Sequence, residues 1–194
     1  MAAVGMKYLT FAPITTETAQ SPITYGTGAV AEHAISGSIT YNYDEQSLYG
    51  DDKLAEYYKG LTGYDIEIGM TELADSLSTL LGIETVTTTG SPAISTYHLV
   101  PDNMTSCGVG FMQTLIVNGT KSYIGYWFHK VTFSINSESA QTRGESVEWQ
   151  TPTLNGKGWG VELDATGVVQ YRDRQVFTTE ALALAWLKAK AGVT

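Results

Sequence analysis

Two β-rich runs meet at Asn118-Gly119, and this junction leaves the chain few ways to fold. The runs are Cys107–Val117 and Lys121–Asn136. Asn-Gly is the preferred pair for a two-residue hairpin turn, because both positions tolerate positive φ. The second run is long enough to bend across a sandwich or barrel. The 12 Tyr and 20 Gly, beside many Thr, also favour strands and tight turns. We therefore expect a mainly β protein.

Two more strands are predicted from alternating apolar and polar residues, at Ala34–Tyr43 and Tyr64–Met70. The first is expected to bury one face, made of Ile35, Ile39, Tyr41 and Tyr43. Between the strands, Asp44–Gly63 is acidic and polar, and we expect a long loop with at most a short helix at Lys53–Lys59. The two strands and this loop could also form one long-armed hairpin.

The remaining elements follow from composition and caps. We expect an extended N-terminal arm over residues 1–33, a strand at Ile83–Thr89 and an irregular stretch to about Ser106. Gly144–Leu154 is predicted as a strand, and the segments 158–163 and 168–173 are predicted to pair across a turn at Asp164–Gly167. All of residues 1–194 are expected to form a single domain.

Two helices are predicted to flank the strands. The first spans Thr71–Gly82, with Thr71 as its cap and a stripe of Leu73, Leu77, Leu80 and Leu81. The second spans about 178–191, with Thr178 as its cap and Gly192 after its end. Phe177 and Leu182 are expected to pack together around that cap, and Leu182, Ala185 and Trp186 are expected to face the β domain.

Charge and composition exclude several classes of protein. The chain has 43% hydrophobic residues and 16% charged residues, which is enough apolar material for a core. No segment approaches the roughly 20 apolar residues of a membrane span, and residues 1–20 lack the pattern of a secretory signal. The net charge of −9 disfavours nucleic-acid binding, because affinity for phosphate comes mainly from Lys and Arg. A single cysteine, Cys107, excludes an internal disulfide and a multi-cysteine zinc site.

No motif predicts an active site, so we expect no enzyme. The three histidines His33, His98 and His129 lack metal-ligand spacing. His98 and Cys107 could be imagined as a base and nucleophile, but no residue is identified to orient them. The sequence predicts no catalytic residue, no metal ligand and no cofactor.

Three other patterns have simpler interpretations. Gly26–Ala31 resembles a dinucleotide-binding fingerprint in letters alone, and we expect a loop. Gly156–Gly158 is predicted to be a turn. The acidic cluster lacks calcium-loop spacing and is predicted to face water; it consists of Asp44, Glu45, Asp51, Asp52 and Glu56.

The aromatic residues leave one alternative open. A sugar-stacking surface could be built from Trp127, Trp149, Trp159 and Trp186, although packing in a core or an interface is equally compatible with them. A carbohydrate- or receptor-binding β-sandwich module is therefore the alternative function.

Several spaced blocks resemble the major tail protein, or tail tube protein, of long-tailed, siphovirus-type bacteriophages. The first block runs from the strand at Ser38 through Leu48–Asp52 and Gly60–Gly63 to the Leu-rich helix that ends at Gly82. The second block is Gly125–Leu154, with its Gln-Thr-Pro-Thr-Leu ending. The resemblance covers about Met6 to Gly156 and leaves the C-terminal helix unmatched.

The resemblance implies a β-sandwich or barrel-like tail tube domain with a long hairpin loop, assembled into rings, usually hexameric, that stack into a tube. It implies a structural virion protein in the tail, made in the host bacterial cytoplasm. Its implied partners are further copies of itself, the tape measure protein, the tail terminator and the distal tail protein. DNA would pass through an acidic lumen without tight binding.

The resemblance also gives roles to particular segments. Thr10–Thr24 suits an arm, and Glu67 is the candidate lumen-facing residue. The candidate inter-ring contact residues lie in the long loop: Asp44, Glu45, Leu48, Tyr49, Asp51, Asp52, Tyr57 and Tyr58.

Overall fold

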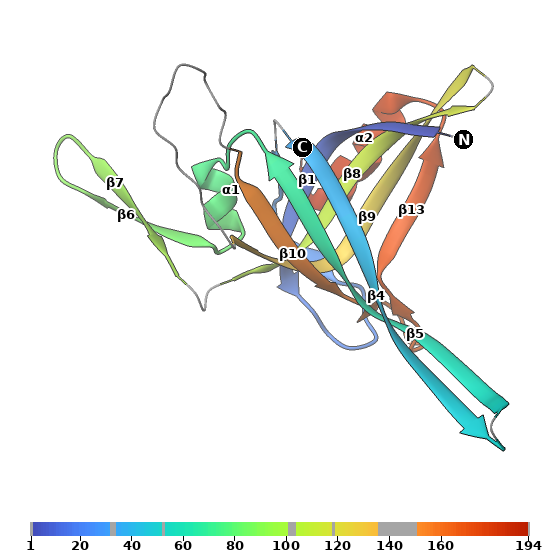
Figure 1. Ribbon diagram of the computed structural model, residues 1–194. Helices are drawn as coiled ribbons and strands as arrows, with labels where there is room; N and C mark the ends of the chain where they lie inside the picture. Colours follow the sequence, from blue (N-terminus) through green and yellow to red (C-terminus); the bar gives the residue numbers. More distant parts are fainter. Residues whose placement is uncertain are drawn as a thin grey trace, which may run out of the picture.

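A strongly curved antiparallel sheet of nine strands forms the body of the protein (Figure 1). The computed structural model describes residues 2–31, 34–51, 53–100, 104–117, 119–135 and 151–193. Along the sheet the order is β2-β1-β8-β9-β10-β5-β4, while β13 pairs with β9 and β3 with β1. The strands are β1 (Ala2–Thr16), β2 (Thr24–Tyr25), β3 (Ala29–Ala31), β4 (Ala34–Gly50), β5 (Lys53–Met70), β8 (Ser106–Val117), β9 (Thr120–Ile135), β10 (Thr153–Trp159) and β13 (Arg172–Phe177).

The β8–β9 hairpin is confirmed. Val117 pairs with Thr120, which leaves a two-residue turn in which Gly119 has a φ of 79°. Asn118 lies outside the described residues. The two strands lie in the middle of the sheet, so the Asn-Gly turn fixes the register at the centre of the fold.

The main core fills the concave side of the sheet. It contains Phe11 of β1, near one end of the strand order, and Tyr64 and Ile66 of β5, near the other end. One continuous cluster can join strands that far apart only because the sheet curls around it. The predicted alternation of Tyr64–Met70 is confirmed, because residues 64, 66, 68 and 70 are buried and residues 65 and 67 are exposed. The mainly β fold with flanking helices is therefore as expected.

The alternation predicted for Ala34–Tyr43 holds only in part. Ile39 and Tyr41 pack against the core, whereas Ile35 and Tyr43 are exposed. The pairing with β5 shifts at Ala34/Ser36 and again at Asn42/Tyr43, close to both of the exposed residues. These bulges break the two-residue period on which the prediction rested.

Residues 2–16 are not a free arm, which corrects the prediction for the N-terminus. They form β1, which pairs with β8 on one side and with β2 and β3 on the other. Leu9 and Phe11 are buried in the core. Of the proposed arm Thr10–Thr24, the first part is thus an inner strand of the sheet.

The helix α2 (Glu180–Ala191) covers the convex side of β1, β8 and β9. Thr179, not Thr178, is its cap, and Gly192 at its end has a φ of 62°. The face toward the sheet consists of the small or slim residues Ala183, Leu187 and Ala191, which pack with Trp127. Leu182, expected in that contact, is 54% exposed. Trp186, also predicted to face the β domain, does pack against this cluster, so the prediction is confirmed for Trp186 and wrong for Leu182 and the exposed Ala185.

The helix α1 (Asp75–Leu80) is shorter than predicted. Its cap position is Ala74 without a side-chain hydrogen bond, so Thr71 lies ahead of the helix. Leu77 and Leu81 enter the core, as their stripe indicated. Beyond α1, β6 (Glu84–Thr89) is confirmed, but it pairs with β7 (Ile94–Leu99), so the stretch to Ser106 is not wholly irregular.

The C-terminal strands differ from expectation at two places. β11 (Val161–Glu162) does pair with β12 (Val169–Gln170). Gly156–Gly158, however, is no turn and lies within β10, while β13 was not predicted as a separate strand. The predicted strand Gly144–Leu154 falls mostly outside the described residues; Thr153 and Leu154 begin β10. Within the described residues, no helix is long and apolar enough to span a membrane.

Candidate functional site

The segment Asp44–Gly63 is a two-stranded arm, not a loop. β4 and β5 stay paired far beyond the body, from Tyr43 opposite Leu61 to Gly50 opposite Lys53 (Figure 1). We call these paired ends, Tyr43–Gly50 and Lys53–Leu61, the arm. Asp51, with a φ of 49°, lies in the turn at its tip, and Asp52 lies outside the described residues. The long-armed hairpin is confirmed, whereas the loop and the helical fragment at Lys53–Lys59 are wrong.

The arm exposes large apolar side chains. Six of them are between 49% and 69% exposed: Tyr43, Leu48, Tyr49, Leu54, Tyr57 and Tyr58. Four of these were candidate contact residues from the sequence, and the structure brings them together with Asp44, Glu45 and Asp51 on one ribbon. Tyr43 was missed because it was predicted to face the core, and Leu54 was missed because it lies in the segment where a short helix was expected.

One face of the arm is held by charge. Lys59 contacts Glu45 directly across the strands, and its ammonium lies 4.6 Å from the centre of the Tyr43 ring. Hydrogen bonding with Lys59 lowers the pKa of the Glu45 carboxyl and raises the pKa of Lys59. Exposed ion pairs of this kind contribute little to stability, because water and salt screen the attraction between the charges. They set the register of the arm but cannot replace a core.

An arm of this kind is unusual in a protein that acts alone. A two-stranded hairpin is at best marginally stable in water without packing on one face. The exposed apolar side chains of the arm gain no burial from the described residues of the body. Contiguous exposed apolar surface of this kind marks a site for contact with another molecule.

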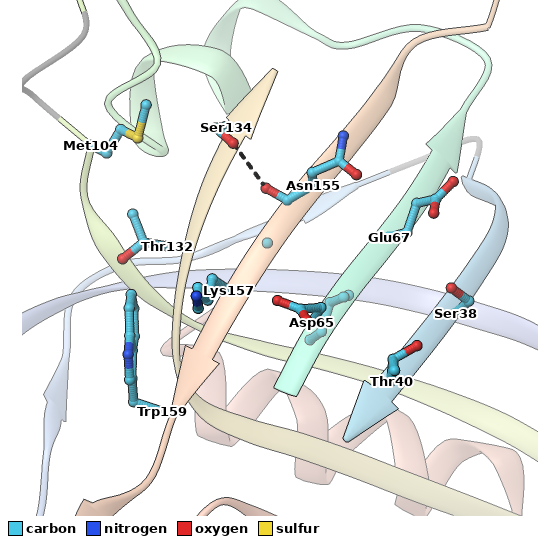
Figure 2. A pocket seen from close by; sticks show the side chains of 12 residues that line it. Ser38, Thr40, Asp65, Glu67, Met104, Thr132, Ser134, Asn155, Lys157 and Trp159 are labelled. Carbon is cyan, nitrogen blue, oxygen red and sulfur yellow. Dashed lines mark hydrogen bonds between the residues drawn. The ribbon is translucent and has the colours of Figure 1, made fainter. Parts of the chain in front are cut away.

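A groove on the convex face of β4, β5, β10 and β9 is the second candidate site (Figure 2). Its volume is about 490 Å³. Polar side chains and one tryptophan line it: Ser38, Thr40, Asp65, Glu67, Thr132, Ser134, Asn155, Lys157 and Trp159, with Met104 at one side. The convex face of the sheet is thus divided between an apolar half under α2 and an open polar half.

Strand periodicity explains the polar lining. Ile66 and Phe133 point into the core, so their neighbours Asp65, Glu67 and Thr132 point outward. Asn42 donates a hydrogen bond to Asp65 at 2.7 Å. Glu67, the candidate lumen residue, is exposed in the groove; whether that surface faces a lumen stays a prediction.

The groove ends at an open sheet edge. Among the described residues β4 pairs only with β5, so the other side of its 17 residues carries no strand partner. Such an edge is a ready site for pairing with another chain. No Pro occurs in β4 to block it.

The residues considered for catalysis are not assembled into a site. His98 is exposed on β7, whereas Cys107 is fully buried on β8 and its thiol donates to the carbonyl of Val131 at 3.4 Å. Burial raises the pKa of the Cys107 thiol, which disfavours the reactive thiolate. His33 lies outside the described residues, and among those described no three His, Cys, Asp or Glu residues could hold a metal ion.

His129 belongs to a polar cluster that the sequence did not reveal. It is 2% exposed on β9, and its Nε2 lies 3.3 Å from Asp173 on β13. Lys190 of α2 contacts the same carboxylate at 2.7 Å. Hydrogen bonding with His129, assisted by Lys190, holds the pKa of Asp173 well below its usual range. The cluster therefore links β9 and β13 to α2.

The tryptophans do not form one surface. Trp127 is fully buried under α2, and Trp186 packs against Phe177 with ring centres 5.8 Å apart. Trp149 lies outside the described residues. Trp159 alone of the three described tryptophans lines the groove, and it is 40% exposed.

Neither the protein-family models nor the curated proteins contain a match to this chain. Its function is therefore inferred from its own residues, with the arm and the groove as the two surfaces that need an explanation.

Proposed function

We propose that this chain is a structural virion protein that assembles into stacked rings to form a phage tail tube, the conduit for genome delivery. The arm carries the proposal. It is a ribbon of two strands with apolar side chains exposed along it, and it has no core of its own. Packing against neighbouring subunits would bury these side chains and supply the stability that an isolated hairpin lacks.

The open edge of β4 supports assembly in a second way. An unblocked edge strand such as the 17-residue β4 promotes aggregation of a monomeric protein, but in an assembly it can pair with a strand of a neighbouring subunit. Pairing of this edge with a neighbouring subunit would extend the curved sheet around a ring. The same rings would carry the arms, so lateral contacts would use the part of β4 within the body, Ala34–Asn42, and axial contacts would use the arm.

The groove supports the role of a conduit. Its charged residues are Asp65, Glu67 and Lys157, which leaves one net negative charge beside polar neutral side chains. A hexameric ring would carry six times the −9 of one chain. A lumen lined by such a surface would repel phosphate, so DNA could slide without being held. Tape measure, terminator and distal tail proteins would be the partners inside the tube and at its ends.

Trp159 favours one alternative function, a carbohydrate-binding module. An exposed indole beside carboxylate and amide groups is suited to stacking and hydrogen bonding with a sugar. The arm, however, would have no purpose in that case, and we therefore rank this function second.

Electron microscopy of the purified protein separates the two. Rings or tubes of uniform diameter are expected for a tail tube subunit. Dispersed single particles, together with glycan binding that Trp159→Ala abolishes, would replace the tail tube by the carbohydrate module.

A further inference from the structure

The arm leaves the body at a bulge. Asn42 pairs with Gly63 and Tyr43 with Leu61, so Thr62 is an extra residue in β5. Its hydroxyl donates to the carbonyl of Asn42 at 3.0 Å. A bulge bends a strand and changes its twist, so this position sets the direction in which the arm points.

Two consecutive residues at the start of β13, Tyr171 and Arg172, hold both strands at this bend. The Tyr171 hydroxyl donates to the carbonyl of Leu61 in β5 at 2.5 Å. The Arg172 guanidinium lies over the ring of Tyr41 in β4, 5.6 Å from its centre. The same guanidinium lies 5.3 Å from the centre of the Tyr126 ring in β9. β4, β5 and β9 therefore meet at residues 171 and 172.

This contact links parts of the sheet that backbone pairing does not link. β4 is an edge strand, and among the described strands β13 pairs only with β9. Tyr41, Arg172 and Tyr126 thus connect a free edge to the middle of the sheet. The centres of the Tyr41 and Tyr171 rings lie 6.3 and 6.4 Å from the centre of the Tyr64 ring. Because Tyr64 belongs to the main core, both residues are packed against that core.

We propose that Arg172 and Tyr171 form a clamp that fixes the direction of the arm relative to the body. Without the clamp, the bulge at Thr62 would act as a hinge, since only the two strands themselves would cross it. Arg172 is a positioning residue: it acts on the arm through Tyr41 and lies outside the arm surface. The clamp is present in a single chain, so this proposal does not depend on the tail tube function.

The guanidinium is the critical group. A planar cation can stack between two rings, whereas the ammonium of lysine is a compact, strongly hydrated charge. Arg172 is exposed, so its removal leaves no buried cavity and the protein is expected to stay folded. Arg174, two residues along the same face of β13 and also exposed, provides a matched control.

Pulsed electron spin resonance on dispersed protein tests the clamp. Spin labels at Ser47→Cys on the arm and Lys121→Cys on the body report the distance between them, and native Cys107 is fully buried and stays unlabelled. We expect one narrow distance distribution with Arg172 present. It should become about twofold broader in Arg172→Ala and in Arg172→Lys, since neither side chain stacks as a plane.

The control decides the outcome. Arg174→Ala should keep the narrow distribution, and Tyr171→Phe, which loses only the hydrogen bond to Leu61, should broaden it less than Arg172→Ala does. Equal widths for Arg172→Ala and Arg174→Ala would overturn the proposal, as would a broad distribution with the clamp intact. Circular dichroism of each variant confirms that the body is folded.

Discussion

The carboxylate of Asp173 lies 3.3 Å from Nε2 of the buried His129, and Lys190 of α2 binds its second oxygen at 2.7 Å. β9, β13 and α2 thus meet at one ionised group. Below the cluster, Tyr25 donates to the carbonyl of His129 at 2.9 Å, and burial raises the pKa of the Tyr25 phenol to about 12. The C-terminal end of α2 is therefore attached by polar contacts. At this end the amide of Gly28 also donates a hydrogen bond to the carbonyl of Ala191.

Removal of the Asp173 carboxylate should lower the free energy of unfolding at neutral pH more than at acidic pH. The pKa of Asp173 is lower in the folded protein than its usual value of about 3.9. Its stabilising effect is therefore full above about pH 4 and is lost as pH falls through the folded-state pKa. Hydrogen bonds to a charged group contribute about 1.5–3 kcal/mol, and because the Asp173 side chain is 31% exposed we expect Asp173→Asn to cost only about 1–2 kcal/mol at pH 7 in urea unfolding.

The same measurements at low pH check the cause. Near pH 2 the difference in unfolding free energy between Asp173→Asn and the unmodified protein should shrink, because this pH lies below the ordinary carboxyl pKa, so the unfolded chain binds a proton at Asp173 that the folded state does not. Asp51→Asn, at the exposed arm tip, should change neither value. If Asp173→Asn lowered the free energy of unfolding by the same amount at every pH, the shape of the side chain, and not its charge, would explain the role of Asp173.

Leu187 and Leu182 should differ sharply although they lie on the same helix. Leu187 is fully buried against the sheet, so Leu187→Ala should cost about 2–5 kcal/mol. Leu182 is 54% exposed, and Leu182→Ala should stay within about 0.5 kcal/mol. Thermal unfolding of the two variants measures this, and similar losses for both would place the buried face of α2 elsewhere.

The arm should be sensitive to protease in dispersed protein and protected after assembly. It has few buried contacts, so it opens locally at low cost. Chymotrypsin is expected to cut near Tyr49 and Tyr57, while the buried Tyr64 in the same strand resists in both states. Mass spectrometry of the fragments identifies the cut sites. Equal cutting of the arm before and after assembly would argue against its burial between subunits.

Reversal of one groove charge should make assembled protein hold DNA. Glu67→Lys adds a cation to a surface that otherwise carries Lys157 alone among its basic residues. We expect DNA retention at low salt, with a log–log salt dependence that steepens by about 0.9 for each added phosphate contact. Glu72→Lys, exposed outside the groove, is the control. Identical retention by both variants would remove the groove from the DNA path.

Sequence patterns predicted the parts of the fold in which one face is buried and the other is not. The Asn-Gly turn gave the central hairpin, and the alternation from Tyr64 to Met70 gave one side of the core. The arm was misread because neither of its faces is buried, so its residues show no alternation. The many charged and polar residues of the arm therefore led to the prediction of a loop.

Glycine misled the prediction for β10. Gly156 and Gly158 resemble a turn, yet a Cβ on either would come within 2.6 Å of Phe133 or 2.1 Å of Tyr64. These glycines make room for aromatic rings on neighbouring strands, which only the packed structure reveals. The Arg172 clamp and the His129 cluster were missed for a similar reason, since each joins residues that are distant in sequence.

Sedimentation velocity of the protein and of one arm variant tests the assembly role most directly. The variant carries Leu48→Ser, Tyr49→Ser, Leu54→Ser and Tyr58→Ser, all exposed positions that leave the core intact. We predict that the unmodified protein forms discrete species far heavier than the 21.0 kDa chain, while the folded variant remains a monomer. An unmodified protein that stays at 21.0 kDa at every concentration, or a variant that assembles equally well, would contradict assembly through the arm.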